Sequence, residues 1–520
     1  MLQTIESINN VVNNFIWGVP AMICIIGVGL YLSLRTGFVQ IRKFPYALKT
    51  TLGRIFKKKE ASDGSMTPFQ AVCTALAGTV GTGNIAGVAG AIAIGGPGAV
   101  FWMWVSALLG MCTKFTEVTL AVHFRERNRH GDYVGGPMYY IKNGLGKNWR
   151  FLAVLYSAFG VLTVFGTGNA TQVNTITTAI DTALINFNVI SESSTGRLNL
   201  ILGIVITLLV GMVLLGGIKR IGQVAEFLAP IMCGIYLLVM VIIMIVNAER
   251  IPSVFGSIFA SAFGKDAVFG GIVGSALSWG IKRGFFSNDA GNGMSPLISA
   301  TTDTSHPVKQ GLVQGFSVYV DTLLVCTCTG LSVLLAGTYN VAADGVGDVL
   351  LVEHAKGIQY GIAFMQEAMA TTIGQAGAML LAVILFIFIF TTMLSYSYQL
   401  ESTCKYLFGE NKWVVTFVRI LFLIFCMFGI LIDGDTIWPM GDIGVGCMLW
   451  VNTFSILLLT PVLMRIVKDY EKQRAQGLNP LFDPATVGIE DEAGVWNQYV
   501  EEKKKRGDYE NPALGYEKKN

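Results

Sequence analysis

The chain has 520 residues, of which 52% are hydrophobic and only 14% are charged, and its net charge is +3. A soluble globular protein carries about a quarter charged residues, so this composition excludes a water-exposed surface of this size. The mean hydropathy of +0.56 indicates a bundle of helices in a lipid bilayer. We expect the bilayer as a partner and no nucleic acid.

The few cysteines and histidines give no sign of a metal or catalytic centre. The nine cysteines fall mainly inside apolar runs, which is not the pattern of a disulfide framework. The four histidines form no cluster with cysteines or carboxylates at metal-ligand spacing. We therefore expect no cofactor and no enzyme. The N-terminus lacks the features of a cleaved signal, and we expect none.

A spanning helix needs about 20 mostly apolar residues, and the sequence predicts eleven such spans. They cover residues 14–34, 67–93, 98–124, 149–172, 198–216, 222–248, 267–285, 311–336, 375–403, 414–432 and 443–464. The second and seventh are rich in Gly, so hydropathy alone ranks them lowest. Two shorter segments, 252–264 and 359–372, have mixed polarity, and we expect them to be helices near the extracellular side.

Loop charge predicts the orientation, because cytoplasmic loops are enriched in Lys and Arg. Every second loop is basic: the first carries Lys57, Lys58 and Lys59, and the loop after the third span carries Arg125 and Arg127. The alternate loops are poor in both residues. The alternation predicts a multi-pass protein of the cell membrane with its N-terminus outside and its C-terminus in the cytoplasm.

These features divide the chain into a membrane domain and a tail. Residues 1–464 form the membrane domain, in which 14–34 is an extra N-terminal helix. Within it, 67–248 and 267–464 are predicted to be two repeats. Residues 465–520 are polar and rich in charge, and they are predicted to be a cytosolic, largely disordered tail.

The segment from Thr74 to Gly90, TALAGTVGTGNIAGVAG, interrupts the second span. Each Gly in a helix interior costs about 1 kcal/mol relative to Ala, and Gly78, Gly81 and Gly83 lie within six residues. A break at membrane depth must line a polar cavity or be buried in protein. Its freed carbonyls suit a cation, and its freed N–H groups suit a carboxylate. The alternative is a glycine face for tight helix packing.

A second break is predicted in the seventh span, where GGIVGSALSWGIKRG contains Gly270, Gly271, Gly274 and Gly280. The two Gly-interrupted spans are five spans apart. Paired interruptions at matching positions are typical of transporters built from inverted repeats. The spacing therefore predicts a repeat of five plus five helices, with the first span outside it.

At these residues the chain resembles the alanine-or-glycine:cation (sodium:alanine) symporter family, over about residues 15–465. The motifs are AGTVGTGNIAGVA (77–89), GGPGAVFWMWVSALLGMCTKFTE (95–117), GGPMYY (135–140), RGFFSNDAGNGMSP (283–296) and HPVKQG (306–311). The resemblance implies the leucine-transporter-like fold of the amino acid/polyamine/organocation superfamily. It also implies Na⁺- or H⁺-driven uptake of alanine, glycine or a similar small neutral amino acid.

The resemblance further implies a sodium site. By likeness to the broken first core helix of that superfamily, the carbonyls of Ala77 and Val80 would bind Na⁺. Thr391 and Thr392 of the ninth span would supply hydroxyls, giving a neutral cage of hard oxygens. The alternative for both hydroxyls is a hydrogen bond to a carbonyl one turn earlier in their own helix.

The same likeness implies the residues that contact substrate. From the first break these are Thr79, Gly81, Thr82, Gly83 and Asn84. Other spans are expected to complete the pocket with Gln172, Ser278, Trp279 and Tyr396. The family commonly has Gly-Trp-Ser-Tyr-Tyr-Gly-Glu in the ninth span, where this chain reads Ser-Tyr-Ser-Tyr-Gln-Leu-Glu from Ser395 to Glu401. That difference leaves glutamine or another polar amino acid open as the substrate.

Charges inside the spans are candidates for function. Lys114 and Glu117 are three residues apart and share a helix face, so a structural or gating pair is expected. Asp321 has no local partner in its span. It is expected either to pair with a Lys or Arg elsewhere or to carry a proton, which leaves H⁺ open beside Na⁺ as the coupling ion.

Overall fold

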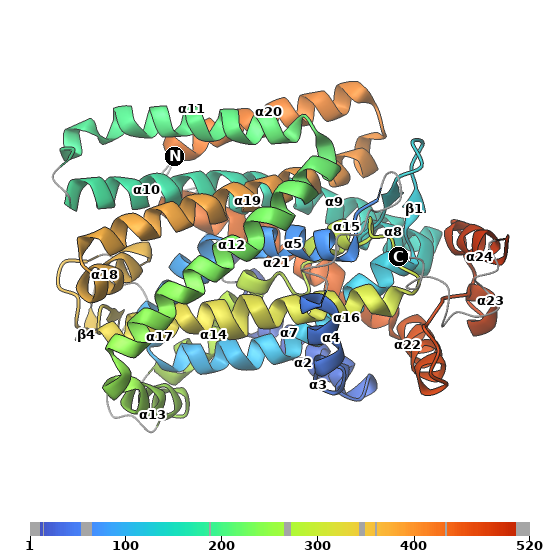
Figure 1. Ribbon diagram of the computed structural model, residues 1–520, viewed down its shortest axis with the longest axis horizontal. Coiled ribbons are helices and arrows are strands. Elements are labelled where there is room, and N and C mark those ends of the chain that lie inside the picture. Colours follow the sequence, from blue (N-terminus) through green and yellow to red (C-terminus); the bar gives the residue numbers. More distant parts are fainter. Residues whose placement is uncertain are drawn as a thin grey trace.

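The chain folds into a bundle of helices, most of which run along the horizontal direction of Figure 1. The computed structural model describes residues 11–13, 15–53, 65–186, 189–264, 272–342, 349–358, 361–431 and 434–505. Helix is present at all eleven predicted spans. The predicted class, an all-helical polytopic membrane protein, is confirmed.

The first six spans lie between residues 19 and 246. In chain order they are α2 (Val19–Arg35), the pair α5 (Pro68–Thr79) and α6 (Val88–Gly95), α7 (Gly98–His123), the pair α9 (Arg150–Phe165) and α10 (Thr171–Asn186), α11 (Thr195–Leu214) and α12 (Gly217–Val246). Single π-helical turns, η1 (Gly83–Gly87) and η4 (Gly166–Ala170), lie within the two pairs. Between the spans lie α3 (Val39–Arg42), α4 (Phe44–Leu52), α8 (Pro137–Tyr140) and an antiparallel hairpin of β1 (Glu126–Arg127) and β2 (Tyr133–Val134).

The remaining five spans follow a short helix, α13 (Ile251–Ala262). They are α14 (Val273–Asn288) with α15 (Met294–Ser299), α16 (Pro307–Val318) with η8 (Tyr319–Cys326) and α17 (Thr327–Ala336), α19 (Gln375–Phe408), α20 (Lys412–Leu431) and α21 (Gly434–Leu458). A short hairpin, β3 (Asn340–Ala342) and β4 (Leu350–Glu353), and helix α18 (Ile362–Ile373) lie between α17 and α19. The short helices expected near 252–264 and 359–372 are therefore present as α13 and α18.

Local sequence signals account for where these helices start and stop. Thr67 caps α5 by accepting from the Gln70 N–H, while the Gln70 side chain accepts from the Thr67 N–H. Helix α6 ends at Gly95, the next residue, Gly96, has a φ of 65° that suits Gly, and Pro97 precedes α7. These turns position the second and third spans side by side.

The bundle has an apolar exterior and a polar interior. Leu208 of α11, Ile245 of α12 and Phe417 of α20 expose 62, 68 and 64% of their surfaces. Lys114 and Glu117 of α7 are fully buried. Among the described residues, eight helices, and the bent pair α5–α6 as a ninth span, are long and apolar enough to cross a membrane. This distribution is what a lipid solvent favours.

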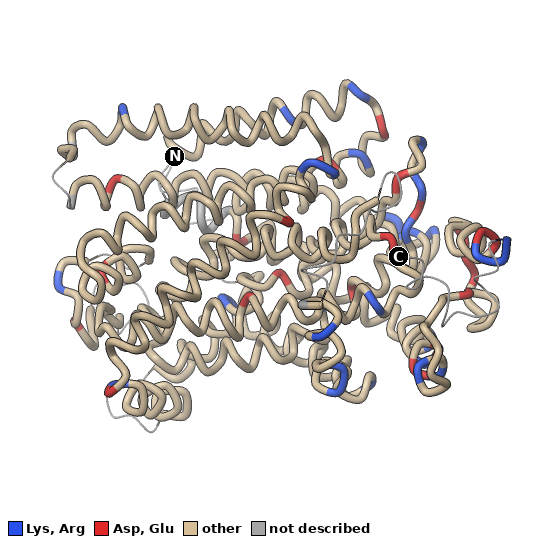
Figure 2. The backbone as a smooth tube through the Cα atoms, viewed as in Figure 1, with Lys and Arg blue, Asp and Glu red and all other residues tan. Residues whose placement is uncertain are grey.

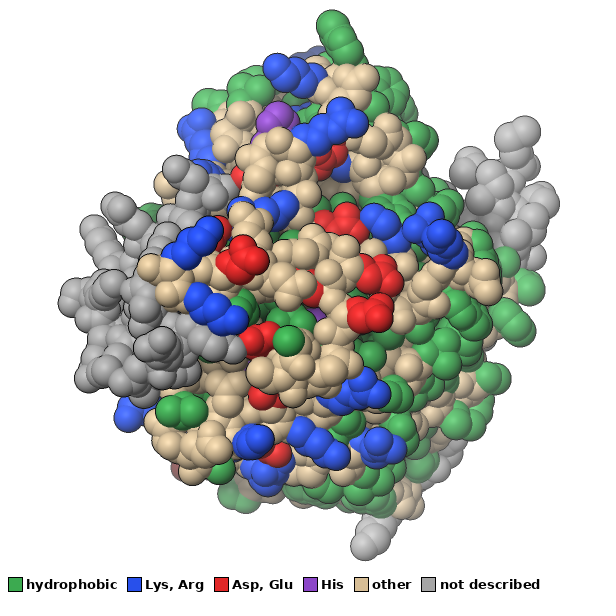
Figure 3. Space-filling view, turned by 90° about the vertical axis from the view of Figure 1, so that its right-hand side faces the viewer, with side chains coloured by type: hydrophobic (Ala, Val, Ile, Leu, Met, Phe, Trp, Pro, Cys, Tyr) green, Lys and Arg blue, Asp and Glu red, His purple; other side chains and the backbone are tan. Residues whose placement is uncertain are grey.

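The two ends of the bundle differ in charge. Helices α13 and α18 lie at one end, and the C-terminal helices lie at the other with the β1–β2 hairpin (Figure 1). Most of the marked charges lie near the second end and few lie along the bundle (Figure 2). Figure 3 looks onto that end, where basic and acidic side chains gather, with hydrophobic side chains on its flank.

The expectation of a largely disordered tail is wrong for its described part, up to residue 505. After α21 the chain forms α22 (Thr460–Ala475), α23 (Pro484–Val487) and α24 (Val495–Lys505). Trp496 is fully buried, and its indole Nε1 donates to the carbonyl of His123, at the end of α7, at 3.0 Å. Its ring packs on Phe482 and on the guanidinium of Arg125.

A second set of contacts joins the tail to the start of α16. The main-chain N–H of Phe482 donates to the carbonyl of Ser305 at 2.9 Å. Burial lowers the pKa of His306 to about 4, so its ring is neutral: Nδ1 accepts from the Val308 N–H at 3.2 Å and Nε2 faces Asp469 at 3.3 Å. The tail is thus packed against the membrane domain.

We expect Trp496→Ala to detach the described part of the tail. The substitution removes a buried indole and its hydrogen bond, which costs about 3 kcal/mol or more. Limited proteolysis of the purified protein should then cleave residues 476–505 faster than in the wild type. Gln498→Ala, on the exposed face of the same helix, is the control and should leave cleavage unchanged. Equal cleavage of Trp496→Ala and wild type would show that the packing does not hold the tail.

Candidate functional site

The second span is broken within its Gly-rich segment. Helix α5 ends at Thr79, Val80 is extended with ψ of 96°, and helix resumes at Gly83. The two halves are bent by 53°. The break predicted between Thr74 and Gly90 is therefore confirmed.

The break frees two carbonyl oxygens. In an α-helix the Ala77 carbonyl would accept from the Gly81 N–H, but that N–H donates to Oδ1 of Asn84 at 2.9 Å. The Val80 carbonyl would accept from the Asn84 N–H, which lies 3.3 Å from the Gly81 carbonyl instead. The side chain of Asn84 thus takes the place of a helical acceptor.

Both freed carbonyls face Thr392 of α19. Its hydroxyl lies 2.9 Å from the Ala77 carbonyl and 3.3 Å from the Val80 carbonyl. The Thr391 hydroxyl lies instead 3.0 and 2.9 Å from the carbonyls of its own helix at Ile387 and Phe388. Of the four residues expected to hold a cation, the structure brings together three and leaves Thr391 out.

Glycine is required where α5 meets α19. A Cβ on Gly78 would lie 2.5 Å from Oγ of Ser395, and a Cβ on Gly81 would lie 2.8 Å from Oγ1 of Thr392. The same Cβ on Gly81 would lie 3.5 Å from Oε1 of Gln172. The glycines therefore bring the backbone of the break next to α19 and next to the start of α10.

Buried polar atoms without partners line this region. Oε1 of Gln172, which faces Gly81, and the hydroxyl of Thr82 have no hydrogen-bond partner in the described part of the chain. Nε2 of Gln172 donates to the Thr167 carbonyl at 3.0 Å, which fixes its orientation. Thr79, by contrast, uses its hydroxyl within α5, at 3.3 Å from the Leu76 carbonyl.

Two aromatic rings close the region. A Cβ on Gly83 would lie 3.3 Å from the ring of Phe286 of α14. A Cβ on Gly168, in the π-helical turn before α10, would lie 2.3 Å from the ring of Tyr396. Tyr396 was expected near the site, whereas Phe286 was not singled out, although it lies in the quoted motif at 283–296.

Ser278 and Trp279 are not brought to the break. They precede Phe286 by eight and seven residues on α14, which is about 10–12 Å along a helix. Both are half-buried, and the Trp279 ring faces Lys282 and Arg283 instead, with the cationic groups 5.3 and 5.1 Å from its centre. The expected contribution of these two residues to the pocket has no support in this arrangement.

Asp321 joins the first break to the neighbouring spans. Nδ2 of Asn84 donates to its Oδ1 at 2.7 Å, and the hydroxyls of Ser287 and Thr322 donate to its Oδ2 at 2.9 and 2.8 Å. Its hydrogen-bond partners are thus an amide and two hydroxyls, rather than the Lys or Arg that one sequence-based alternative expected.

The predicted position of the second break is wrong for the described part of that segment, from residue 272 onward. Helix α14 continues through Gly274 and Gly280, and the chain breaks at residues 289–293 instead, where Asp289, Gly291 and Gly293 have φ of 56, 88 and 81°. Gly280 serves packing, because a Cβ there would lie 2.5 Å from the Ala99 carbonyl of α7. Gly270 and Gly271 lie outside the described residues.

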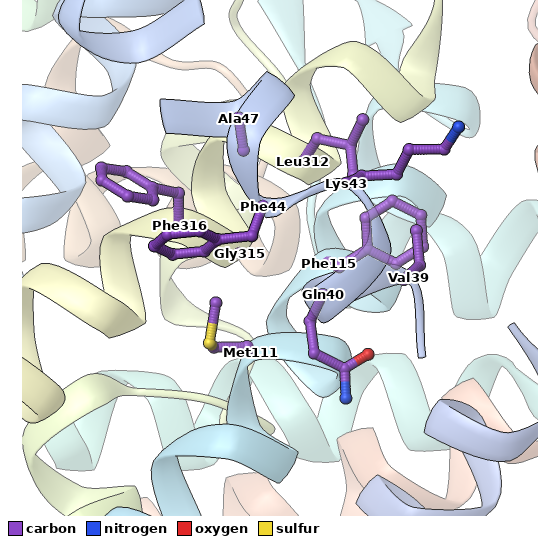
Figure 4. A pocket seen from close by; sticks show the side chains of 10 residues that line it. All are labelled: Val39, Gln40, Lys43, Phe44, Ala47, Met111, Phe115, Leu312, Gly315 and Phe316. Carbon is purple, nitrogen blue, oxygen red and sulfur yellow. The ribbon is translucent and has the colours of Figure 1, made fainter. Parts of the chain in front are cut away.

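The structure also has a hollow outside the broken segments themselves. It is lined by residues of α3, α4, α7 and α16, among them Val39, Phe44, Phe115 and Phe316 (Figure 4). None of the residues expected to bind substrate or cation lines it. The two broken helices therefore remain the candidate functional site.

Two broken helices in a bundle of spans, with freed carbonyls beside a buried hydroxyl, define the class of secondary transporters. The model of the sodium:alanine symporter family matches residues 2–484, and the chain belongs to this family. A relative from Methanococcus maripaludis, "Sodium/alanine symporter AgcS", is 37% identical over 470 residues, covering 90% of this chain and 98% of the relative. Another from Bacillus subtilis, "Probable sodium/glutamine symporter GlnT", is 34% identical over 487 residues, covering 93 and 94%.

A solved structure supports the fold. The crystal structure of MhsT in complex with L-phenylalanine aligns with a TM-score of 0.53 at 12% identity, covering 77% of this chain and 90% of MhsT. The expected leucine-transporter-like fold class is confirmed. The expected family membership is confirmed as well.

We expect Gly81→Ala to disable the first break. The added methyl would lie 2.8 Å from Oγ1 of Thr392, closer than van der Waals contact allows, so the break would open or shift. Sodium- and alanine-dependent thermal stabilisation of the purified protein should weaken at least about tenfold in apparent affinity, or about 1.4 kcal/mol. Gly256→Ala, in α13 with open space around it, is the control. Unchanged affinity in Gly81→Ala would rule out this break as the binding region.

The neighbouring hydroxyls of α19 give a matched pair of variants. Thr392→Val removes the hydroxyl that faces both freed carbonyls, and we expect the sodium concentration for half-maximal stabilisation to rise about tenfold. Thr391→Val removes a hydroxyl that bonds to carbonyls of its own helix and to the Met232 sulfur of α12 but faces neither freed carbonyl, so it should stay within about twofold of wild type. If Thr391→Val raised that sodium concentration more than Thr392→Val, the Thr391 hydroxyl would be the sodium ligand instead.

Proposed function

We propose that this protein is a secondary active symporter that couples Na⁺ entry to uptake of a small neutral amino acid, alanine or glycine, by alternating access. The observation that carries the proposal is the first break, where two freed carbonyls meet the Thr392 hydroxyl. Membership of the sodium:alanine symporter family supports it.

Na⁺ is proposed to bind between α5 and α19. The carbonyls of Ala77 and Val80 and the hydroxyl of Thr392 are neutral oxygens, which suit a hard monovalent cation. The hydroxyl can turn its lone pairs toward the ion, because it is both donor and acceptor. None of these three ligands is a carboxylate, so the protein does not neutralise the ion there. The positive charge of Na⁺ can therefore attract the carboxylate of the substrate.

The amino acid is proposed to bind on the other side of the break. Its carboxylate would lie at the N-terminal end of the half-helix that begins at Gly83, where the first-turn N–H groups and the helix dipole favour an anion. The Thr82 hydroxyl can donate to it, and the unpartnered Oε1 of Gln172 can accept from the ammonium group. Phe286 and Tyr396 bound this space, which favours a small side chain.

Glutamine is the alternative substrate, and one observation bears on it. Of the two residues that depart from the family's usual Gly-Trp, Ser395 packs against Gly78 between helices α5 and α19. Tyr396 packs against Gly168, three residues before the start of α10 and close to Gln172. Tyr396 is therefore the residue to exchange if the substrate proves to be larger.

The orientation is proposed with the N-terminus outside and the C-terminus in the cytoplasm. The end of the bundle that carries α22–α24 gathers the basic side chains (Figures 2 and 3). Cytoplasmic faces are enriched in Lys and Arg. Helices α13 and α18 would then lie on the extracellular side.

Uptake of radiolabelled alanine into proteoliposomes tests the function. We expect accumulation that needs an inward Na⁺ gradient and is blocked by glycine and, more weakly, by serine. Best competition by glutamine would keep the mechanism and change the substrate, and gradient-driven uptake by H⁺ alone would change the ion. A folded protein that accumulates no amino acid under either gradient would refute symport.

A further inference from the structure

Four charged side chains are buried around the second break, and their charges do not cancel. Lys114 and Glu117 of α7 are fully buried, Asp321 of η8 exposes 1% of its surface, and Asp289 exposes 3%. One ammonium against three carboxylates leaves a net charge of −2 when all four are ionised. An uncompensated charge at membrane depth is strongly unfavourable, so the cluster favours binding of a cation.

The carboxylates differ in the hydrogen-bond donors that they receive. Asp321 receives three, from Asn84, Ser287 and Thr322, and both of its oxygens are used. Several donors stabilise an ionised carboxylate. Asp321 is thus arranged to remain charged, and the single charge of Lys114 offsets it.

Glu117 and Asp289 each receive one side-chain donor, and Glu117 also faces the main-chain N–H of Gly291. Oε2 of Glu117 accepts from Nδ2 of Asn452 at 2.8 Å, and Oδ1 of Asp289 accepts from Nδ2 of Asn292 at 2.7 Å. Their second oxygens, Oε1 and Oδ2, are shielded from water and have no partner among the described residues. An anionic oxygen in this situation loses its solvation without replacement, so both sites favour a bound proton.

Lys114 does not neutralise either of them directly. Its Nζ donates to the main-chain carbonyl of Asn288, the last residue of α14, at 2.7 Å. Within the described part of the chain no carboxylate lies within ion-pair distance of it. The expected pair of Lys114 with Glu117 is therefore not formed. Lys114 instead stabilises the C-terminal end of a half-helix, where a cation is favourable.

The same groups hold the second break in place. Nδ2 of Asn452 donates to Glu117 and also to the carbonyl of Gly291, within the break, at 2.7 Å. The Tyr156 hydroxyl donates to the carbonyl of Asn292 at 3.0 Å. A change in the charge of Glu117 therefore acts, through Asn452, on the backbone that α14 and α15 share.

The other titratable groups that face this pair come from five elements. They are Lys114 on α7, Asp321 on η8, Tyr140 on α8, Tyr156 on α9 and Tyr396 on α19. The three tyrosines are buried and neutral, so they add no charge. Lys114 is the one cation in this set, and it already offsets Asp321.

We propose that Glu117 and Asp289 together form a site that binds an exchangeable proton, and that transport requires this proton. The proton comes from water and bonds to Oε1 of Glu117 or Oδ2 of Asp289. It reduces the net negative charge of the cluster from −2 to −1, and it returns to water when the site deprotonates. The inference rests on the proposed function, because its first readout is amino acid uptake.

The pH profile of uptake tests the proposal. With the pH equal on both sides, uptake by the wild type should fall about tenfold per pH unit once the site deprotonates, as for one proton. Glu117→Gln and Asp289→Asn mimic the protonated form, so each should shift the falling limb to higher pH or remove it. Glu353→Gln, an exposed carboxylate on β4, should keep the wild-type profile.

Three outcomes are distinguishable. A wild-type falling limb that persists unchanged in both active variants overturns the proton site. Wild type that takes up amino acid equally at all pH values overturns it too. Wild type that takes up nothing under any gradient refutes the proposed symport itself.

Infrared spectroscopy of the wild type tests the proposal even if the variants fail to fold. A protonated buried carboxyl group has a carbonyl stretching band that an ionised carboxylate lacks. We expect this band at neutral pH and its loss on raising the pH, in parallel with uptake. Absence of the band at a pH where the wild type transports overturns the proposal without any variant.

Discussion

The structure depends on one constraint: a polypeptide at membrane depth cannot leave its N–H and C=O groups unpaired. Asn84 meets this constraint at the first break. Its Oδ1 accepts the Gly81 N–H, and its Nδ2 is anchored on Asp321. Because the Gly81 N–H is satisfied by a side chain, the Ala77 carbonyl is released toward Thr392. One amide therefore stabilises the interruption and keeps a carbonyl oxygen out of the helical hydrogen bonds.

The two breaks are stabilised by different chemistry. At the first, the groups that face the backbone are neutral, and the nearest carboxylate, Asp321, is saturated with donors. At the second, a lysine holds the end of α14, and Asn452 bridges a carboxylate to Gly291. A set of neutral oxygens suits Na⁺, which binds and dissociates without any change in the protonation of its ligands. A charged network responds to protons, since its hydrogen bonds change with its ionisation.

Sequence patterns predicted the spans and the first break because hydropathy and dense glycine are local signals. They misplaced the second break because small residues serve two purposes. Gly274 and Gly280 lie in a continuous helix, and Gly280 packs on α7, whereas the break needed left-handed backbone at Asp289, which only the folded chain reveals. Both adjacent threonines were expected as ligands, and the rotation of α19 turns only the Thr392 hydroxyl toward the freed carbonyls. The tail was wrongly predicted to be largely disordered because its few apolar residues, Trp496 among them, pack against residues that are distant in the sequence.

Glycines also allow the two halves of the broken second span to pack closely against different helices. Gly78 and Gly81 press α5 and the break against α19, while Gly83 and Gly95 press the second half against α14, with the Gly95 Cβ position 2.8 Å from the backbone of Ala276. Interfaces this close move as rigid contacts, since packed surfaces shift between discrete arrangements rather than deform. If the second span were one continuous helix, it would pack against both α14 and α19 and would move them together. The interruption at Val80–Thr82 allows α14 and α19 to move separately, and it lies where the ion and the substrate are proposed to bind. Binding at the interruption can therefore set how the two halves of the second span are placed relative to each other.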